Sequence, residues 1–274
     1  MPDNWRHDST RRAKAGLIDI TVPNPARVGD YLSGGRDNFE ADRKAVRTLE
    51  ATVPFVSAIS AAARAFRQRA VRYLVAEAGM RQFLDIGTSA TMTGGTHKVA
   101  QSLAPECRVA YVDSDPMVLA HARALLTSAP DGAVAVVDAD VTHPLAMFAG
   151  AAEILDFSRP VAILLMATLG YTLGDASAAE ILLSLAGAVP AGSHVALYHQ
   201  ASDLDPAMAV AAHRWNAMSR RKITLRSRVQ LTRLLAGLDL VPPGLVLVTD
   251  WRPALDDPRF ERPVPVYGAV ARKP

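Results

Sequence analysis

The chain has 274 residues, of which 50% are hydrophobic, so it is long enough to bury one substantial core. Its formal net charge is only +3 and its arginines are spread along the sequence, which predicts that it has no nucleic-acid-binding face. No stretch reaches the roughly 18 apolar residues of a membrane span, and the N-terminus lacks the apolar segment of a signal peptide. The single cysteine, Cys107, has no disulfide partner and lies in an apolar run, so we expect a buried thiol in a cytoplasmic protein without membrane contact.

The first part of the chain has no strand pattern. Residues 1–24 are polar and without period, which predicts a flexible tail. Residues 25–79 show helical patterns that are interrupted at Gly34, at Gly35 and at Pro54. The longest pattern repeats apolar side chains every four residues, at Phe66, Ala70, Leu74 and Ala78. The sequence therefore predicts a helical extension over residues 25–79.

Residues 80–274 alternate between short apolar runs and helical patterns, and the helical patterns cover residues 96–104, 116–128, 176–189, 205–219 and 227–238. Five runs lack polar alternation, which is typical of parallel strands buried on both faces of a sheet. They are residues 81–87, 107–113, 133–141, 160–169 and 193–200. Two last apolar segments, 238–248 and 265–273, contain prolines and lie close in sequence, so we expect them to pair antiparallel at one edge. The prediction is a doubly wound α/β domain with a mostly parallel, seven-stranded sheet and helices on both faces.

Acidic residues stand at the ends of the first three predicted strands. Ligands of open α/β sheets bind beyond the carboxyl ends of the strands, where Asp85, Asp113 and Asp140 are expected. The two oxygens of Asp113 suit the two hydroxyls of a ribose, and Asp140 could accept from an adenine amine. Gly87 would let a ligand approach the backbone closely. Asp115 precedes a proline and a helix, which favours a helix N-cap over a ligand contact.

The glycine pattern after the first strand argues against a dinucleotide. A pyrophosphate site needs G-x-G-x-x-G, whereas residues 87–92 read GTSATM and match only the first glycine. Asp113 also follows Gly87 at a longer spacing than the roughly 20 residues of that fingerprint. A nucleoside without phosphates fits better, and S-adenosylmethionine is the common one.

Several segments together resemble the actinobacterial S-adenosyl methyltransferase family, which was first catalogued as a domain of unknown function. The similarity extends from about Val22 to the C-terminus. The segments are PNPARVGDYLSGGRDNFEADR, FRQRAVRYLVAEAGMRQFLDIGTS, HKVAQSLAPECRVAYVDSDPMVLAHARALL, RSRVQLTRLLAGLDLVPPGLV, WRP and GAVARKP. The resemblance implies a class I, Rossmann-like methyltransferase sheet that ends in a β-hairpin, with residues 80–274 as the cofactor-binding domain.

The resemblance also implies roles for particular residues. S-adenosylmethionine, whose product is S-adenosylhomocysteine, would contact the strand ends, and the segment DYLSGGRDNF would cover it as a lid. The implied cofactor-binding residues are Asp85, Gly87, Thr88, Ser89, Asp113, Ser114, Asp140 and Val141 from the strand ends, and Tyr31, Gly34, Gly35 and Asn38 from the lid. The chain departs from the family at Ser89, where a second loop glycine is expected, and at Ala63, where an asparagine is expected.

Methyl transfer from a sulfonium needs an aligned nucleophile and, for an oxygen nucleophile, a base. His199 at the end of the fifth strand and Tyr171 after the fourth are the two titratable candidates on the expected face. The fourth strand is followed by ATLGYTLGD and not by the Asn/Asp-Pro-Pro motif of amino-group methyltransferases, which favours a small-molecule hydroxyl or amine as acceptor. No cluster has the spacing of a metal site, so no metal is predicted.

Three functions stay open at this point. The first is an active methyltransferase for a small molecule. The second is a non-catalytic regulatory protein that binds S-adenosylmethionine or S-adenosylhomocysteine. The third, which the glycine pattern disfavours, is an NAD-dependent oxidoreductase. The sequence also leaves a homodimer open.

Overall fold

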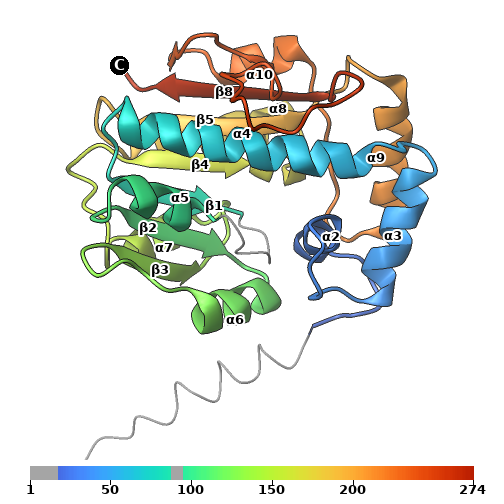
Figure 1. Ribbon diagram of the computed structural model, residues 1–274, viewed down its shortest axis with the longest axis horizontal. Helices are drawn as coiled ribbons and strands as arrows, with labels where there is room; N and C mark the ends of the chain where they lie inside the picture. Colours follow the sequence, from blue (N-terminus) through green and yellow to red (C-terminus); the bar gives the residue numbers. More distant parts are fainter. Residues whose placement is uncertain (1–17, 88–94) are drawn as a thin grey trace, which may run out of the picture.

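The computed structural model describes residues 18–87 and 95–274. In this part of the chain, eight strands form one sheet in the order β3-β2-β1-β4-β5-β8-β6, with β7 also paired to β8 (Figure 1). The strands are β1 (Gln82–Ile86), β2 (Arg108–Asp113), β3 (Ala133–Asp138), β4 (Ala162–Met166), β5 (His194–Gln200), β6 (Asp239–Leu240), β7 (Val246–Leu247) and β8 (Val266–Arg272). Strands β1 to β5 are parallel, which confirms the predicted doubly wound sheet.

The antiparallel edge also confirms the prediction. Strand β8 pairs antiparallel with β5 on one side and with β6 and β7 on the other. Strands β6 and β7 pair with successive parts of β8, so together they occupy the seventh position of the sheet as one interrupted strand. A turn with a cis bond between Pro242 and Pro243 separates them, because proline has no N–H to continue the ladder.

Helices cover both faces of the sheet. They are α2 (Pro25–Leu32), α3 (Glu40–Glu50), α4 (Val56–Ala76), α5 (Thr96–Leu103), α6 (Pro116–Leu125), α7 (Pro144–Ala151), α8 (Asp175–Gly187), α9 (Pro206–Met218) and α10 (Arg228–Leu234), with the 3-10 helix η1 (Thr168–Tyr171). One core lies between the sheet and helices α4 and α5, and a second lies between the sheet and helices α7, α8 and α10. The sequence patterns predicted all of these helices except α7 and η1.

Helix α4 shows how an amphipathic pattern determines packing. Its residues Phe66, Ala70 and Leu74 are fully buried against the sheet, while Arg72 on the opposite side is exposed. At the end of the helix, Gly79 takes a positive φ of 68°, which glycine adopts without strain. In Figure 1, α4 lies along the strand direction in front of β4 and β5, from the side of α3 to the opposite end of these strands.

Helices α2, α3 and α9 lie beyond the carboxyl ends of the parallel strands (Figure 1). Asn24 caps α2, and Asp205 caps α9, each with a proline as the first helical residue. Asp115 caps α6 by accepting from two backbone N–H groups, which confirms its predicted structural role. Helices α2, α3 and α9 therefore lie where an open sheet binds its ligands.

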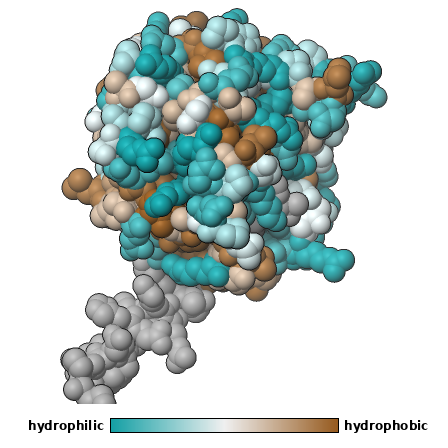
Figure 2. Space-filling model, turned by 60° about the vertical axis from the view of Figure 1, so that its left-hand side comes forward, coloured by the Kyte–Doolittle hydropathy of each residue, from teal (hydrophilic) through white to brown (hydrophobic). Residues whose placement is uncertain are grey.

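The surface carries no large apolar area on the side seen in Figure 2, where hydrophobic side chains lie in small groups between hydrophilic ones. The most exposed large apolar residues, Leu145, Leu183 and Leu255, are far apart in sequence. Cys107 is fully buried, as predicted, and burial raises the pKa of its thiol to about 11. In the described part of the chain, no helix combines the length and the apolarity needed to cross a bilayer.

Candidate functional site

A cavity of about 640 Å³ lies at the carboxyl ends of β1, β2, β3 and β4. Its sheet side is formed by residues at the strand ends, and its opposite side by α2, α3, α4 and α9. Six residues predicted for the site lie in its wall: Gly87, Asp113, Ser114, Asp140, Val141 and Tyr171. The volume is in the range of small-molecule sites, roughly 300–1,000 Å³. The topology of the sheet thus brings these residues together from separate loops.

Gly87 needs to be a glycine at the end of β1. Its φ is +78°, and a Cβ atom there would lie 2.8 Å from Oγ1 of Thr168. Thr168 donates its hydroxyl to the carbonyl of Ile86 and so joins η1 to the end of β1. Ala167, the residue before, has a positive φ of 64° at the end of β4, a strained conformation that turns the chain into η1. The backbone is therefore exposed to the cavity between β1 and β4.

Asp113 ends β2 with its carboxyl group in the cavity wall. Its Oδ1 accepts the N–H of Asp115 at 2.9 Å. Burial raises the pKa of Asp113 to about 7, although the N–H groups of Asp115 and Ser114 and the charge of Arg221 act against this shift. A half-buried acceptor whose ionised form is disfavoured is suited to ligand donors, because hydrogen bonds from a ligand would stabilise that form.

Asp140 follows β3 in the same wall. Its Oδ1 accepts from the backbone N–H of Thr142 at 2.9 Å and from the hydroxyl of Thr142 at 2.7 Å. Burial raises the pKa of Asp140, but the bonds from Thr142 and the charge of Arg221 outweigh it, so the pKa is lowered overall. The second oxygen, Oδ2, lies 4.0 Å from Nη2 of Arg221. Asp140 is thus ionised and has one oxygen free of the turn.

Asp85 is placed differently from the other two acids. It is 1% exposed, does not line the cavity, and accepts from the hydroxyl of Thr96 at 2.7 Å. Burial raises the pKa of Asp85, while Arg67 and Thr96 act to lower it. Its carboxylate anchors the start of α5. The predicted cofactor residues Thr88 and Ser89 lie outside the described residues.

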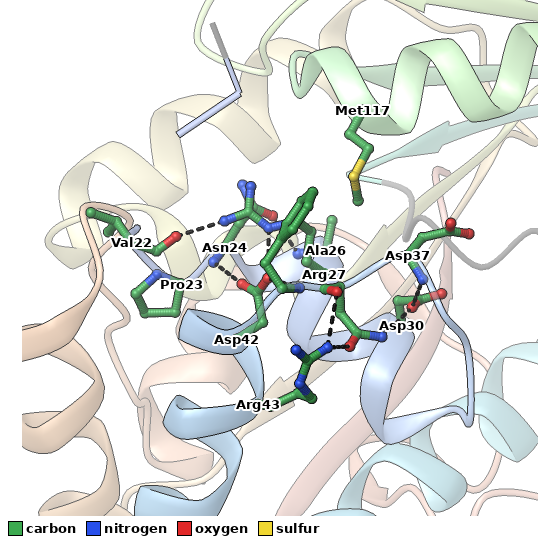
Figure 3. A network of polar contacts seen from close by, with 12 residues as sticks. Val22, Pro23, Asn24, Ala26, Arg27, Asp30, Asp37, Asp42, Arg43 and Met117 are labelled. Atoms are coloured by element: carbon green, nitrogen blue, oxygen red, sulfur yellow. Dashed lines mark hydrogen bonds and ion pairs between the residues drawn. The ribbon is translucent and has the colours of Figure 1, made fainter. Parts of the chain in front are cut away.

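The α2 segment is tied to the sheet by a buried polar network. Asn24 donates to Oδ2 of Asp115 at 2.7 Å, which connects the start of α2 to the end of β2. Arg27 and Asp42 form a buried ion pair at 2.8 Å, and Arg27 also donates to the carbonyl of Val22 (Figure 3). A buried pair with further hydrogen bonds fixes geometry even where its net stabilisation is small. The network holds α2 against the cavity.

The cavity face of α2 differs from the predicted one. Helical residues one turn apart lie on the same face, and Val28, Gly29, Leu32 and Ser33 line the cavity, together with Pro25 and Ala26 of the first turn. Tyr31, Gly34, Gly35 and Asn38, which were predicted as cofactor residues, do not line the cavity. Tyr31 points away from this face and is 38% exposed. Part of the family segment thus lies beside the cavity, while the residues of it that were predicted to bind the cofactor lie on other sides.

Asp30 explains the glycines that follow α2. Its buried carboxylate accepts from the backbone N–H of Asp37 at 2.8 Å and from the side chain of Asn38 at 2.9 Å (Figure 3). A Cβ at Gly35 would lie 2.0 Å from Oδ1 of Asp30, and Gly34 has a positive φ of 77°. This turn is therefore packed and hydrogen-bonded around Asp30.

Tyr171 and Tyr198 lie in the cavity wall near the ends of β4 and β5. Burial raises the pKa of both phenols. Each is therefore a neutral hydroxyl at physiological pH, suited to donate a hydrogen bond and not to take up a proton. The guanidinium of Arg221 lies 5.9 Å from the centre of the Tyr171 ring, within the range of a cation–π contact.

His199 is buried and does not line the cavity. Its Nδ1 lies 2.9 Å from the carbonyl of Gln200, and its Nε2 lies 2.9 Å from Nη1 of Arg226. Burial lowers the pKa of His199 to about 4. The strand-end position suggested a base that faces the ligand, whereas the side chain points to a buried arginine instead.

Arg226 was not predicted as a site residue, yet it holds one wall of the cavity. Its side chain is 0% exposed and donates to the carbonyls of Leu169, Thr172 and Gly174 and to the carboxylate of Asp175. These acceptors span η1 and the start of α8. An arginine in the polar sequence KITLRSR carries no signal for such burial, because only the fold brings its acceptors together.

Arg64 in α4 is another cavity residue that was not predicted. It lines the cavity and donates from Nη1 to the hydroxyl of Ser33 at 2.7 Å and to that of Ser60 at 2.9 Å. Ala63, the departure from the family pattern, lies in the wall beside it. A charged residue inside an amphipathic helix, next to the apolar face, was the available signal for Arg64.

Comparisons with known proteins agree with this geometry. A sequence model of a family described as S-adenosyl methyltransferase matches residues 11–274. The structure of a DUF574 family protein from Streptomyces avermitilis is 36% identical, with a TM-score of 0.91 over 94% of this chain and 100% of that chain. A putative methyltransferase from Thermobifida fusca is 35% identical, with a TM-score of 0.85 over 93% of this chain and 96% of that one. The search of curated proteins returns no match.

A more distant structure shows the fold class. Human N-acetylserotonin methyltransferase, solved with S-adenosylmethionine, is 15% identical and has a TM-score of 0.50 over 98% of this chain and 66% of that chain. At this identity the likeness concerns the fold alone. It supports the class I methyltransferase arrangement of the sheet and its helices.

Proposed function

Because the chain belongs to the S-adenosyl methyltransferase family, whose cofactor is S-adenosylmethionine, we propose that it transfers a methyl group to a small organic molecule bound in the cavity. The observation that carries this proposal is the composition of the cavity wall. The strand-end side is polar, with Asp113 and Asp140, and the helical side is mainly apolar. One cavity thus offers surroundings for a nucleoside and for a second, less polar molecule.

The strand-end residues suit the cofactor. Asp113 would accept from the ribose hydroxyls. These hydrogen bonds would stabilise the ionised carboxylate, whose pKa is raised to about 7 by burial. Gly87 would admit the cofactor close to the backbone, because glycine has no side chain. A larger residue is also disfavoured at this position, since its Cβ would crowd Thr168. The oxygen of Asp140 outside the Thr142 turn would accept from the adenine amine, with Val141 beside the ring.

When bound, the cofactor supplies an electrophilic methyl group, so the chain itself mainly has to align the acceptor and exclude water. Tyr171 is the residue of the wall that we propose for alignment. Its neutral hydroxyl, held near Arg221, would donate a hydrogen bond to the acceptor molecule. We propose that His199 acts through Arg226 as a positioning residue and not as the base, because its Nε2 lone pair already faces the guanidinium.

The test uses the full-length protein with S-adenosylmethionine and a small-molecule extract of an actinobacterium. We expect S-adenosylhomocysteine to accumulate, together with an extract component that is heavier by one methylene unit in mass spectrometry. Asp113→Ala serves as the matched control and should form little of either product. If the wild type forms neither S-adenosylhomocysteine nor a heavier extract component, the protein is a non-catalytic cofactor binder and the proposal is overturned.

Three further predictions accompany this proposal. A cytoplasmic location and the division into a tail (1–24), a helical extension (25–79) and a cofactor-binding domain (80–274) stay predictions. So does a homodimer. The position of α4 in the main core suggests that the extension and the domain fold together, because the buried side of α4 packs on the sheet.

A further inference from the structure

The helical side of the cavity has a distinct composition. Its wall includes Leu49, Val53, Val56, Ile59, Met208 and Trp215, which come from α3, α4, α9 and the turn between α3 and α4. We call these six residues the apolar wall. An apolar wall favours a ligand with a hydrocarbon or aromatic body, because burial of apolar surface contributes about 25 cal/mol per Å².

Arg64 is one of the cations in the cavity wall, and it lies on α4, the helix that also carries Val56 and Ile59. Among the described residues, the hydrogen-bond partners of the Arg64 guanidinium are two neutral hydroxyls, those of Ser33 and Ser60, and no carboxylate. Burial and the neighbouring Arg67 lower the pKa of Arg64, which means that its positive charge is poorly compensated. A bound anion would compensate it.

Arg64 and Arg67 have different neighbours in the cavity wall. Arg67 lies three residues further along α4, about 4.5 Å along the helix axis. The charge of Arg67 lowers the pKa of Asp85 at β1 and of Tyr111 at β2, so Arg67 is close to the strand ends. Arg64 instead contacts Ser33 at the end of α2. Both charges act to lower the pKa of Tyr198 on β5, so the contact with α2 is what distinguishes Arg64.

We propose that the methyl acceptor is an apolar small molecule with an anionic group, such as a carboxylate or sulfonate, and that Arg64 binds this group. The inference rests on the proposed function and names the substrate class for the same cavity. Arg64 then acts as a specificity-determining residue. Its planar guanidinium can donate to both oxygens of such a group while the apolar wall holds the body of the molecule.

The test compares two probes that differ by one sulfonate, 8-anilinonaphthalene-1-sulfonate and neutral N-phenyl-1-naphthylamine. Their fluorescence is titrated against the full chain saturated with S-adenosylhomocysteine, so that the cofactor region is filled. We expect the wild type to bind the sulfonate at least tenfold more tightly than the neutral probe. We expect Arg64→Gln to lose this preference while its affinity for the neutral probe stays within twofold. Arg64→Lys should keep part of the preference.

The control is Arg72→Gln, which removes the same charge from an exposed position of the same helix and should change neither affinity. The binding of S-adenosylhomocysteine is measured separately by calorimetry and should stay within twofold in Arg64→Gln. Failure of that binding in the wild type would overturn the proposed function. Equal affinity of the wild type for both probes would overturn the assignment of Arg64 to the acceptor. The assignment would also be overturned if Arg64→Gln lost S-adenosylhomocysteine binding tenfold and retained the sulfonate preference.

Discussion

The Nε2 atom of His199 lies 2.9 Å from Nη1 of Arg226, and both side chains are buried. A guanidinium can only donate, so Nε2 is the acceptor and the proton of the neutral ring is on Nδ1, where it meets the carbonyl of Gln200. The pair connects the end of β5 to the segment that carries η1, because Arg226 also donates to the carbonyl of Leu169. It therefore fixes the wall in which Tyr171 stands.

His199→Ala should lower the free energy of unfolding by roughly 1–3 kcal/mol, because a buried donor of Arg226 loses its acceptor. His199→Gln, which retains an acceptor, should recover part of the loss. Denaturant titrations at pH 7.5 measure both values. A free energy of unfolding that is the same in His199→Ala and wild type would show that the bond contributes nothing.

The pH dependence of the same pair follows from the lowered pKa of His199. The folded-state value of about 4 lies below the ordinary value of 6.5, so the stabilisation is fully present above pH 6.5 and is lost as the pH falls towards 4. Glutamine does not titrate. The stability advantage of wild type over His199→Gln should therefore be constant above pH 6.5 and decrease below it, and a pH-independent difference would contradict the assignment.

Gly35→Ala should destabilise the fold by roughly 2 kcal/mol or more, because its Cβ would meet the carboxylate of Asp30 at 2.0 Å. Gly187→Ala is the matched control, since Gly187 ends α8 with open space around it and should change stability by less than about 1 kcal/mol. Thermal unfolding of the two variants gives the comparison. If both variants unfold at the wild-type temperature, the turn after α2 is not packed as described.

Asp113→Asn should be more stable than the wild type without cofactor above pH 7. The folded-state pKa of Asp113, about 7, lies above the ordinary value of 3.8, so its contribution is complete below pH 3.8 and is lost as the pH rises to 7. Asparagine avoids the buried charge, and the gain at pH 8 should be roughly 1–4 kcal/mol. The gain should fade between pH 7 and 4 in denaturant titrations. A gain of the same size at pH 4 and pH 8 would argue against a buried charge at this position.

The fold could be predicted well from the sequence, for a physical reason. The run of β4 is apolar at every position and β1 is buried at every position, because both faces of the sheet are covered, and this leaves a clear pattern. Helix α7 was missed because residues 144–151 are apolar on nearly all sides and show no amphipathic period, even though Leu145 is 87% exposed.

The candidate site was predictable in part. Positions at strand ends, such as Asp113 and Asp140, follow from topology alone. Which side of α2 faces the cavity depends on how the helix docks, so Ser33 was missed while Tyr31 was chosen. The orientation of His199 depends on Arg226, which lies 27 residues away in the sequence and is brought next to it only by the fold. Contacts of this kind have no local signature.

The central claim is that Asp113 binds the ribose of the cofactor, and calorimetric titration with S-adenosylhomocysteine at pH 8 tests it directly. Removal of two charge-assisted hydrogen bonds, worth roughly 1.5–3 kcal/mol each, should weaken binding by Asp113→Ala at least tenfold relative to the wild type. NAD should bind to neither protein. Binding of S-adenosylhomocysteine to Asp113→Ala with wild-type affinity would contradict the ribose assignment, and absence of binding to the wild type would contradict the cofactor site as a whole.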